Sequence, residues 1–73
     1  MTHSDLINLW PTVVSFAADI GVSYEAAKGM RRRGSVPSGY WRAMVRSAEA
    51  RGIHGITYEV LANIAALTKE AAE

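Results

Sequence analysis

The sequence contains no cysteine, only two prolines, and no apolar run close to the length of a membrane span. Without cysteine the chain can form neither a disulfide nor a thiolate metal site. A membrane-spanning helix needs about 20 predominantly apolar residues in succession. The first residues, Met1 to Asp5, also lack the basic stretch and apolar run of a secretory signal. We therefore expect a cytoplasmic protein with no membrane association.

Residues that serve catalysis or metal binding are equally scarce. Neither histidine, His3 or His54, has cysteine or acidic residues at ligand spacing. No pair of carboxylates stands out as acid and base, and the glycines around Arg31 to Arg33 lack the lysine and the preceding strand of a phosphate-binding loop. We expect no enzymatic activity, no metal, no cofactor and no small-molecule ligand.

The length of 73 residues predicts a single domain, residues 1–73, because a typical domain has about 150 residues. A domain this small buries only about 60% of the surface that its unfolded chain exposes. Its limited core favours self-association.

Positive charge is concentrated in one segment, although the net charge of the chain is only +1. From Lys28 to Arg51 there are seven cations and one anion, Glu49, which gives this segment a net charge of +6. A basic segment of this kind suits a surface that faces DNA phosphates. Charge alone is equally compatible with a solvated polar face.

Apolar spacing and turn residues predict five helices and no strand. Thr12, Ser23 and Thr57 are suitable N-cap residues, and Gly21 is a suitable helix end. The predicted helices cover residues 4–10, 13–20, 24–33, 38–50 and 58–71. We expect a core of apolar residues from their inner faces: Leu6, Trp10, Phe16, Ile20, Val22, Trp41, Val45 and Leu61.

Residues 13–33 have the features that a helix-turn-helix requires. Two helices that cross closely need a small residue at the crossing, here Ala17, and the turn needs a residue that tolerates a positive φ, here Gly21. Other apolar residues attach both helices to the rest of the domain: Phe16, Ile20, Val22, Ala27 and Met30.

This pattern resembles the helix-turn-helix of the phage lambda repressor and Cro superfamily. The resemblance is carried by Ala17, by Gly21-Val22-Ser23, and by Ala27 and Met30. The segment Gly34–Pro37 and the pair Tyr40-Trp41 are similar to those of short Cro-like regulators from phages, prophages and bacterial chromosomes. The resemblance covers residues 6–61 and implies an all-α, five-helix lambda-repressor-like DNA-binding domain.

Two residues depart from the family pattern. Ala27 is smaller than the usual Ile or Val, and Gly29 lies inside the third helix, where it costs about 1 kcal/mol relative to Ala. Three interpretations of Gly29 stay open: the helix becomes ordered when it binds DNA, the backbone approaches DNA closely at this position, or the glycine is simply tolerated near a frayed helix end.

The resemblance implies that the third helix lies in the major groove of double-stranded DNA. Lys28 or Arg32 can donate to guanine O6 and N7, and Glu25 can accept from cytosine N4 or orient a neighbouring arginine. Phosphate contacts position a protein without reading sequence. The implied base-contacting residues are Ser23, Tyr24, Glu25, Lys28 and Arg32, and the implied phosphate-contacting residues are Arg31, Arg33 and Arg42.

We therefore expect a sequence-specific transcriptional regulator, a repressor, encoded by a bacterium or phage and associated with the nucleoid. It would bind a near-palindromic operator as a homodimer. On the last predicted helix, residues 58–71, Leu61 would face its own core, whereas Ile64 and Leu67 would face the partner copy. Two alternatives stay open: a protein-interaction module with a basic docking face, and a DNA-binding antitoxin whose last helix binds another protein.

Overall fold

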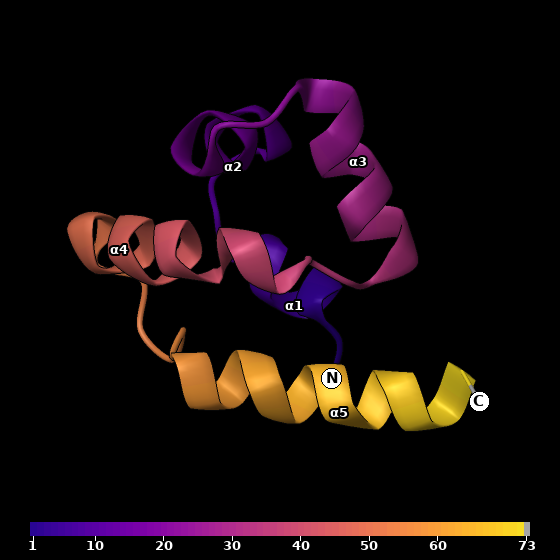
Figure 1. The fold of residues 1–73 in the computed structure, drawn as a ribbon. Helices are drawn as coiled ribbons and strands as arrows, with labels where there is room; N and C mark the ends of the chain where they lie inside the picture. The colour runs from indigo at the N-terminus through magenta and orange to yellow at the C-terminus, as the bar shows by residue number, and fades with distance from the viewer. Residues whose placement is uncertain (73) are drawn as a thin grey trace.

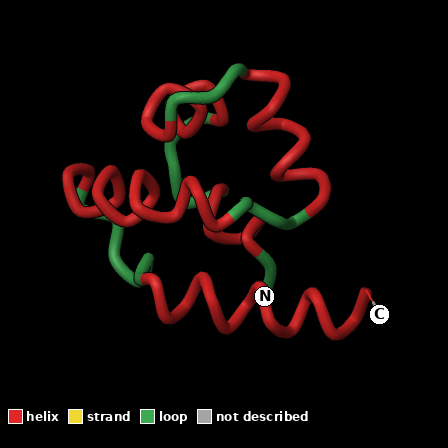
Figure 2. The backbone as a smooth tube through the Cα atoms, in the orientation of Figure 1, coloured by secondary structure: helices red, strands yellow, loops and turns green. Residues whose placement is uncertain are grey.

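The computed structural model describes the backbone of residues 1–72 and the side chains of residues 1–67. This part of the chain contains five α-helices and one short 3-10 helix. Residues 1–72 contain no strand and form a compact all-α globule (Figures 1 and 2), as the sequence predicts. None of these helices is long and apolar enough to cross a membrane. The elements are α1 (His3–Ile7), α2 (Val13–Ile20), α3 (Tyr24–Arg33), η1 (Ser38–Tyr40), α4 (Trp41–Arg51) and α5 (Tyr58–Ala72).

Three hydroxyl side chains cap the helices as predicted. The hydroxyls of Thr12, Ser23 and Thr57 each accept a hydrogen bond from the backbone N–H three residues later, at 3.0, 3.1 and 3.1 Å. These bonds satisfy N–H groups that have no partner within the helix. Gly21 ends α2 in the left-handed conformation, with φ of +76°.

Two helix boundaries differ from the prediction by more than one residue. The first helix, expected over residues 4–10, ends at Ile7, because the N–H groups of Leu9 and Trp10 bond to carbonyls three residues back in tighter turns. The helix expected over residues 38–50 begins instead with the 3-10 turn η1, in which Tyr40 N–H donates to the Pro37 carbonyl at 3.0 Å. The α-helical part starts at Trp41.

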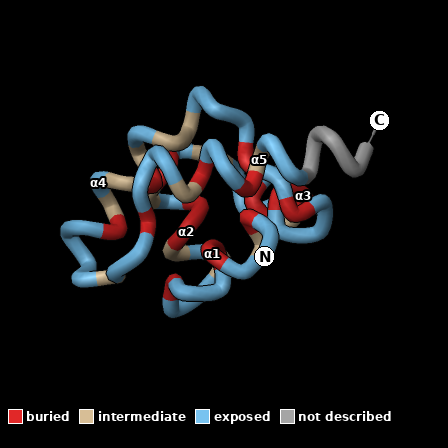
Figure 3. Tube along the Cα trace, turned by 90° about the horizontal axis from the view of Figure 1, so that it is seen from below, coloured by how far each residue is buried: buried red, intermediate tan, exposed pale blue. Residues whose placement is uncertain are grey.

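The helices are arranged in three levels. Helices α1 and α4 lie between the pair α2 and α3 on one side and α5 on the other (Figure 1). The helices are buried along one side and exposed along the other (Figure 3). The buried apolar residues are Leu6, Ile7, Trp10, Phe16, Ala17, Ile20, Ala27, Met30, Val36, Met44, Ala48, Ile56, Leu61 and Ile64.

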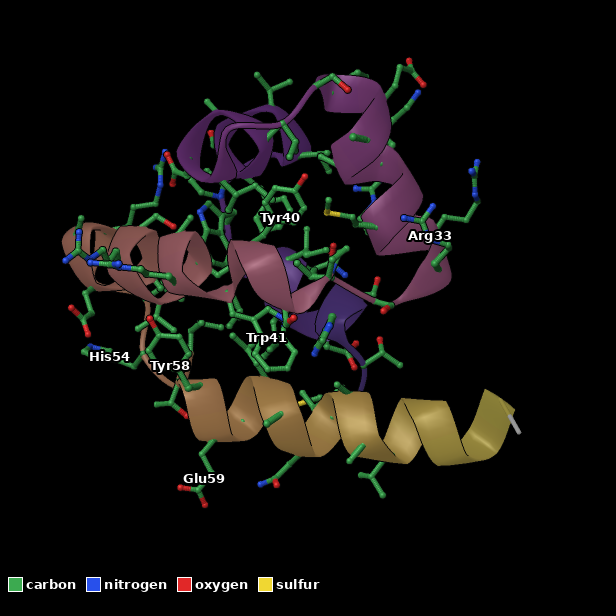
Figure 4. The ribbon with its side chains drawn as sticks, in the orientation of Figure 1. Arg33, Tyr40, Trp41, His54, Tyr58 and Glu59 are labelled. Carbon is green, nitrogen blue, oxygen red and sulfur yellow. The ribbon has the colours of Figure 1, made fainter. Side chains whose placement is uncertain are left out.

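Most of the expected core is buried, but three of its members are not fully so. Val22, Trp41 and Val45 lie at the edge of the core and are only partly buried. Figure 4 shows how two neighbouring aromatic side chains fill opposite sides of the central level: Tyr40 points toward α2 and α3, and Trp41 points toward α5.

The expected partner-facing role of Ile64 is wrong. Ile64 is only 5% exposed and belongs to the protein's own core, because it lies three residues after buried Leu61 on the side of α5 that packs against α1 and α4. Leu67 is 65% exposed. The side chains beyond Leu67 lie outside the described residues.

The imidazole of His3 forms a buried polar link between four parts of the chain. It is 1% exposed; its Nδ1 accepts a hydrogen bond from the Val36 N–H at 2.8 Å, and its Nε2 lies 3.0 Å from the Leu61 carbonyl oxygen. Both contacts are satisfied by the neutral tautomer with the proton on Nε2. The ring also packs edge-on against Trp41, with centroids 6.0 Å apart. His3 thereby connects α1, the loop after α3, the start of α4, and α5.

Replacing His3 by alanine should severely destabilise the fold. The substitution leaves the buried Val36 N–H without a partner, at about 1 to 3 kcal/mol, in a domain whose total stability is on the order of 5 to 15 kcal/mol. It also removes the His3 bond to the Leu61 carbonyl, which keeps its hydrogen bond within α5. Chemical denaturation followed by circular dichroism measures the loss. His54→Ala is the matched control, because His54 is exposed and its removal should change stability by about 0.5 kcal/mol or less. Equal midpoints for the two variants would contradict the role assigned to His3.

Candidate nucleic-acid interface

Helices α2 and α3 are joined by a turn of three residues, Gly21, Val22 and Ser23. Gly21 adopts the left-handed conformation, and the Val22 N–H donates to the Ala17 carbonyl at 3.0 Å, which reverses the chain tightly. Ala17 is 4% exposed, so its small side chain lies inside the packing of α2. The left-handed conformation predicted for Gly21 is confirmed, and Ala17 is buried, as a residue at the crossing of the two helices would be.

An ion pair fixes α2 to the far end of α4. The Asp19 carboxylate accepts hydrogen bonds from the Arg51 guanidinium, at 2.5 and 3.2 Å, and from the Trp10 indole N–H at 2.9 Å. The bond from Arg51, followed by the bond from Trp10, holds the pKa of the Asp19 carboxyl below its ordinary 3.8. A carboxyl whose pKa is lowered in the folded state stabilises the fold at pH values above its ordinary pKa. This stabilisation is lost as the pH falls through the lowered pKa.

The N-terminus holds the end of α3 in place. The His3 N–H donates to the Gly34 carbonyl at 3.2 Å, and Gly34 packs so closely on Thr2 that an added Cβ would lie 3.2 Å from the Thr2 Cβ. Two residues later, Val36 donates to the His3 ring. The sequence gives no sign of these contacts, because the partners are more than 30 residues apart.

The outward face of α3 carries polar side chains. Glu25, Lys28 and Arg32 follow the spacing i, i+3 and i+7, so they share one side of the helix. The opposite side carries Ala27 and Met30, which are buried against the other helices. Four of the predicted base-contacting residues therefore lie at the outward side or the start of α3: Tyr24, Glu25, Lys28 and Arg32.

A small charge cluster occupies the first turns of α3. The Lys28 ammonium lies 3.5 Å from the Glu25 carboxylate and 4.8 Å from the centre of the Tyr24 ring. Ser23, the fifth predicted base-contacting residue, is exposed, and its hydroxyl already accepts the Ala26 N–H as the helix cap. The cluster is electrically balanced by its own ion pair.

The last turn of α3 is strongly cationic. Arg31, Arg32 and Arg33 are all exposed, and within residues 1–67 none of them has a carboxylate within 4.0 Å. Arg42 is also exposed and equally lacks such a partner in that range, but it lies on α4. Within that part of the chain, no carboxylate competes with an external anion for these four guanidinium groups.

Gly29 leaves room for the Arg33 side chain. Arg33 folds back along α3 (Figure 4), and its guanidinium nitrogen Nη1 lies 3.0 Å from the point that a Cβ on Gly29 would occupy. Gly29 does not have a positive φ, so its backbone conformation does not require glycine. The backbone conformation of α3 therefore gives no reason for a glycine at this position.

Residues 1–67 enclose no pocket that could hold a small molecule. Comparison of the chain with protein families, curated proteins and solved structures finds no match. The outward surface of α3, together with the contacts that hold α3 in place, is therefore the candidate functional site.

Replacing Gly29 by alanine should stabilise the protein by about 1 kcal/mol, because alanine is the better helix former and the only close neighbour is the movable end of Arg33. For a domain of this size the melting temperature should rise by about 4 to 8 °C. Gly21→Ala is the matched control: it meets no neighbour within 4 Å, but φ of +76° disfavours it, so it should lower the melting temperature. A lower melting temperature for Gly29→Ala would mean that the fold itself needs this glycine.

Proposed function

We propose that this chain is a sequence-specific DNA-binding protein of the lambda repressor and Cro type, which binds a near-palindromic operator as a homodimer and represses transcription. The observation that carries the proposal is the cationic, outward face of α3, whose arginines have no acidic partner within residues 1–67. Two helices joined by a three-residue turn hold this face away from the core.

The dimensions of α3 fit the proposed role. Ten residues make a helix about 15 Å long, and the major groove of DNA, about 12 Å wide, accepts one helix. In the proposed complex the first turns of α3 approach the base edges, where Tyr24, Glu25 and Lys28 lie, with Arg32 one turn beyond Lys28. The Ser23 hydroxyl accepts the Ala26 N–H and keeps its own proton for donation to DNA.

In the proposed complex, three further exposed arginines bind phosphates. Arg31 and Arg33 lie in the last turn of α3, and Arg42 lies in the first turn of α4, which follows a short loop. A guanidinium group can donate two parallel hydrogen bonds to a phosphate. Such contacts supply affinity for any duplex, whereas the base contacts select the sequence.

Dimerisation follows from the size of the binding surface. One α3 reads only a few base pairs, which is too little to find one operator among about 10⁶ or more competing sites. Two copies about 34 Å apart would read two half-sites on one face of the duplex. With Ile64 buried in the core, exposed Leu67 is the residue of α5 that we propose for the contact between the copies.

The test is the salt dependence of binding. Affinity for a shuffled duplex should fall about 10³-fold or more between 50 and 200 mM salt if the dimer contacts six or more phosphates. Arg31→Gln should weaken binding to the shuffled duplex and to a duplex selected from a random library alike, and should reduce the salt slope. Arg32→Ala should weaken binding to the selected duplex alone, by about 1 to 3 kcal/mol.

Arg46→Gln is the matched control for these variants. Arg46 is an exposed cation on α4, one turn beyond Arg42, so its removal changes the net charge equally but spares α3. We expect little change in DNA affinity. If Arg46→Gln and Arg31→Gln lost equal amounts of DNA affinity, the binding would be unspecific charge attraction. Binding to an acidic protein without affinity for any duplex would favour the protein-interaction module instead.

A further inference from the structure

One carboxylate lies in the middle of the surface that faces DNA in the proposed complex. Glu25 shares the outward side of α3 with Lys28 and Arg32, and its side chain is 81% exposed. A surface built only to attract phosphates would not carry a negative charge at this position. Glu25 therefore reduces the affinity of α3 for DNA of arbitrary sequence.

Glu25 contributes only modestly to the fold: its charge lies in the first turn of α3, where it interacts favourably with the helix dipole by about 0.3 to 1 kcal/mol. The helix start is already capped by Ser23, whose hydroxyl accepts the Ala26 N–H. The carboxylate of Glu25 makes one ion pair, with Lys28, and ion pairs this exposed contribute little to stability. These modest contributions leave the exposed carboxylate available for a role in binding.

The ion pair presents a hydrogen-bond acceptor beside a donor on adjacent turns of α3. The Lys28 ammonium is held between the Glu25 carboxylate and the Tyr24 ring, with 39% of the Lys28 side chain exposed. In the major groove, guanine offers the acceptors O6 and N7, and cytosine offers the N4 amino group as a donor. The donor and acceptor of this pair match those of a guanine–cytosine base pair.

We propose that Glu25 is the specificity-determining residue of α3 and that, with Lys28, it selects a guanine–cytosine pair in each half-site; this inference rests on the proposed function. At the matching pair, Lys28 donates to guanine and Glu25 accepts from the cytosine N4 amino group. At other pairs the carboxylate loses its hydration without gaining that partner, close to phosphate charges. The discrimination comes from a penalty on wrong sequences as well as from a contact with the right one.

Two variants at position 25 separate the contact from the charge. Glu25→Ala removes both, so it should bind a shuffled duplex several-fold more tightly than the wild-type chain does. The preference for the duplex selected by the wild-type chain over the shuffled one should fall by about 5- to 150-fold. Glu25→Asp keeps the charge but withdraws the oxygens by one methylene, so it should lose the preference without gaining affinity for the shuffled duplex.

Glu59→Ala is the matched control, because Glu59 is an exposed glutamate on α5, on the side of the molecule away from α3 (Figure 4). It should leave the preference unchanged. Thermal melts of all variants establish that they fold.

The base pair is identified by changing the selected duplex. Each guanine–cytosine pair is replaced in turn by adenine–thymine, and at one position per half-site the wild-type chain should lose about 5- to 150-fold, whereas Glu25→Ala should lose little. If Glu25→Ala weakens both duplexes alike, or keeps the wild-type preference, the assignment to Glu25 is overturned while DNA binding stands. If the wild-type chain prefers no duplex at all, the proposed function fails, and this inference fails with it.

Discussion

The structure depends on the pair of hydrogen bonds made by the buried imidazole of His3. A chain of 73 residues has few apolar side chains with which to define one packing arrangement. His3 adds a fully satisfied polar link, from Val36 after α3 to Leu61 on α5, and its ring packs on Trp41. The Trp41 indole in turn donates to the Val36 carbonyl at 2.9 Å. Because unpaired buried groups are costly, this link favours one arrangement of α3, α4 and α5 over others.

The same link connects the core to the candidate interface. Val36 follows α3 by only three residues, so fixing Val36 also fixes where α3 ends. The ion pair of Asp19 and Arg51 holds α2, and α2 packs against the inner side of α3. The outward side of α3 thus carries residues that contribute little to the fold, among them Glu25, and a binding role gives a reason for its presence there.

Local features of the fold could be predicted from the sequence, and distant contacts could not. The caps Ser23 and Thr57 and the turn at Gly21 were predictable because their partners lie within a few residues. His3 could not be recognised as a core residue, because its partners lie 33 and 58 residues away. Periodicity also identified an apolar side of α5 correctly but not what covers it, so Ile64 was assigned to a partner copy although it is buried in the protein's own core.

The candidate site follows the same rule. Helical spacing alone was enough to bring Glu25, Lys28 and Arg32 to one side of α3. The position of Arg33 over Gly29 was not predictable, because it depends on the conformation of a long side chain.

The central claim is that DNA binds to the outward side of α3. The most direct test is a titration of the isotope-labelled chain with duplex DNA, followed by the chemical shifts of its backbone amides. If DNA binds there, the largest changes lie within Tyr24–Arg33, with smaller ones near Arg42, and the Val36 amide keeps its protection from hydrogen exchange. Largest changes over residues 58–67, or no change with any duplex, would contradict it.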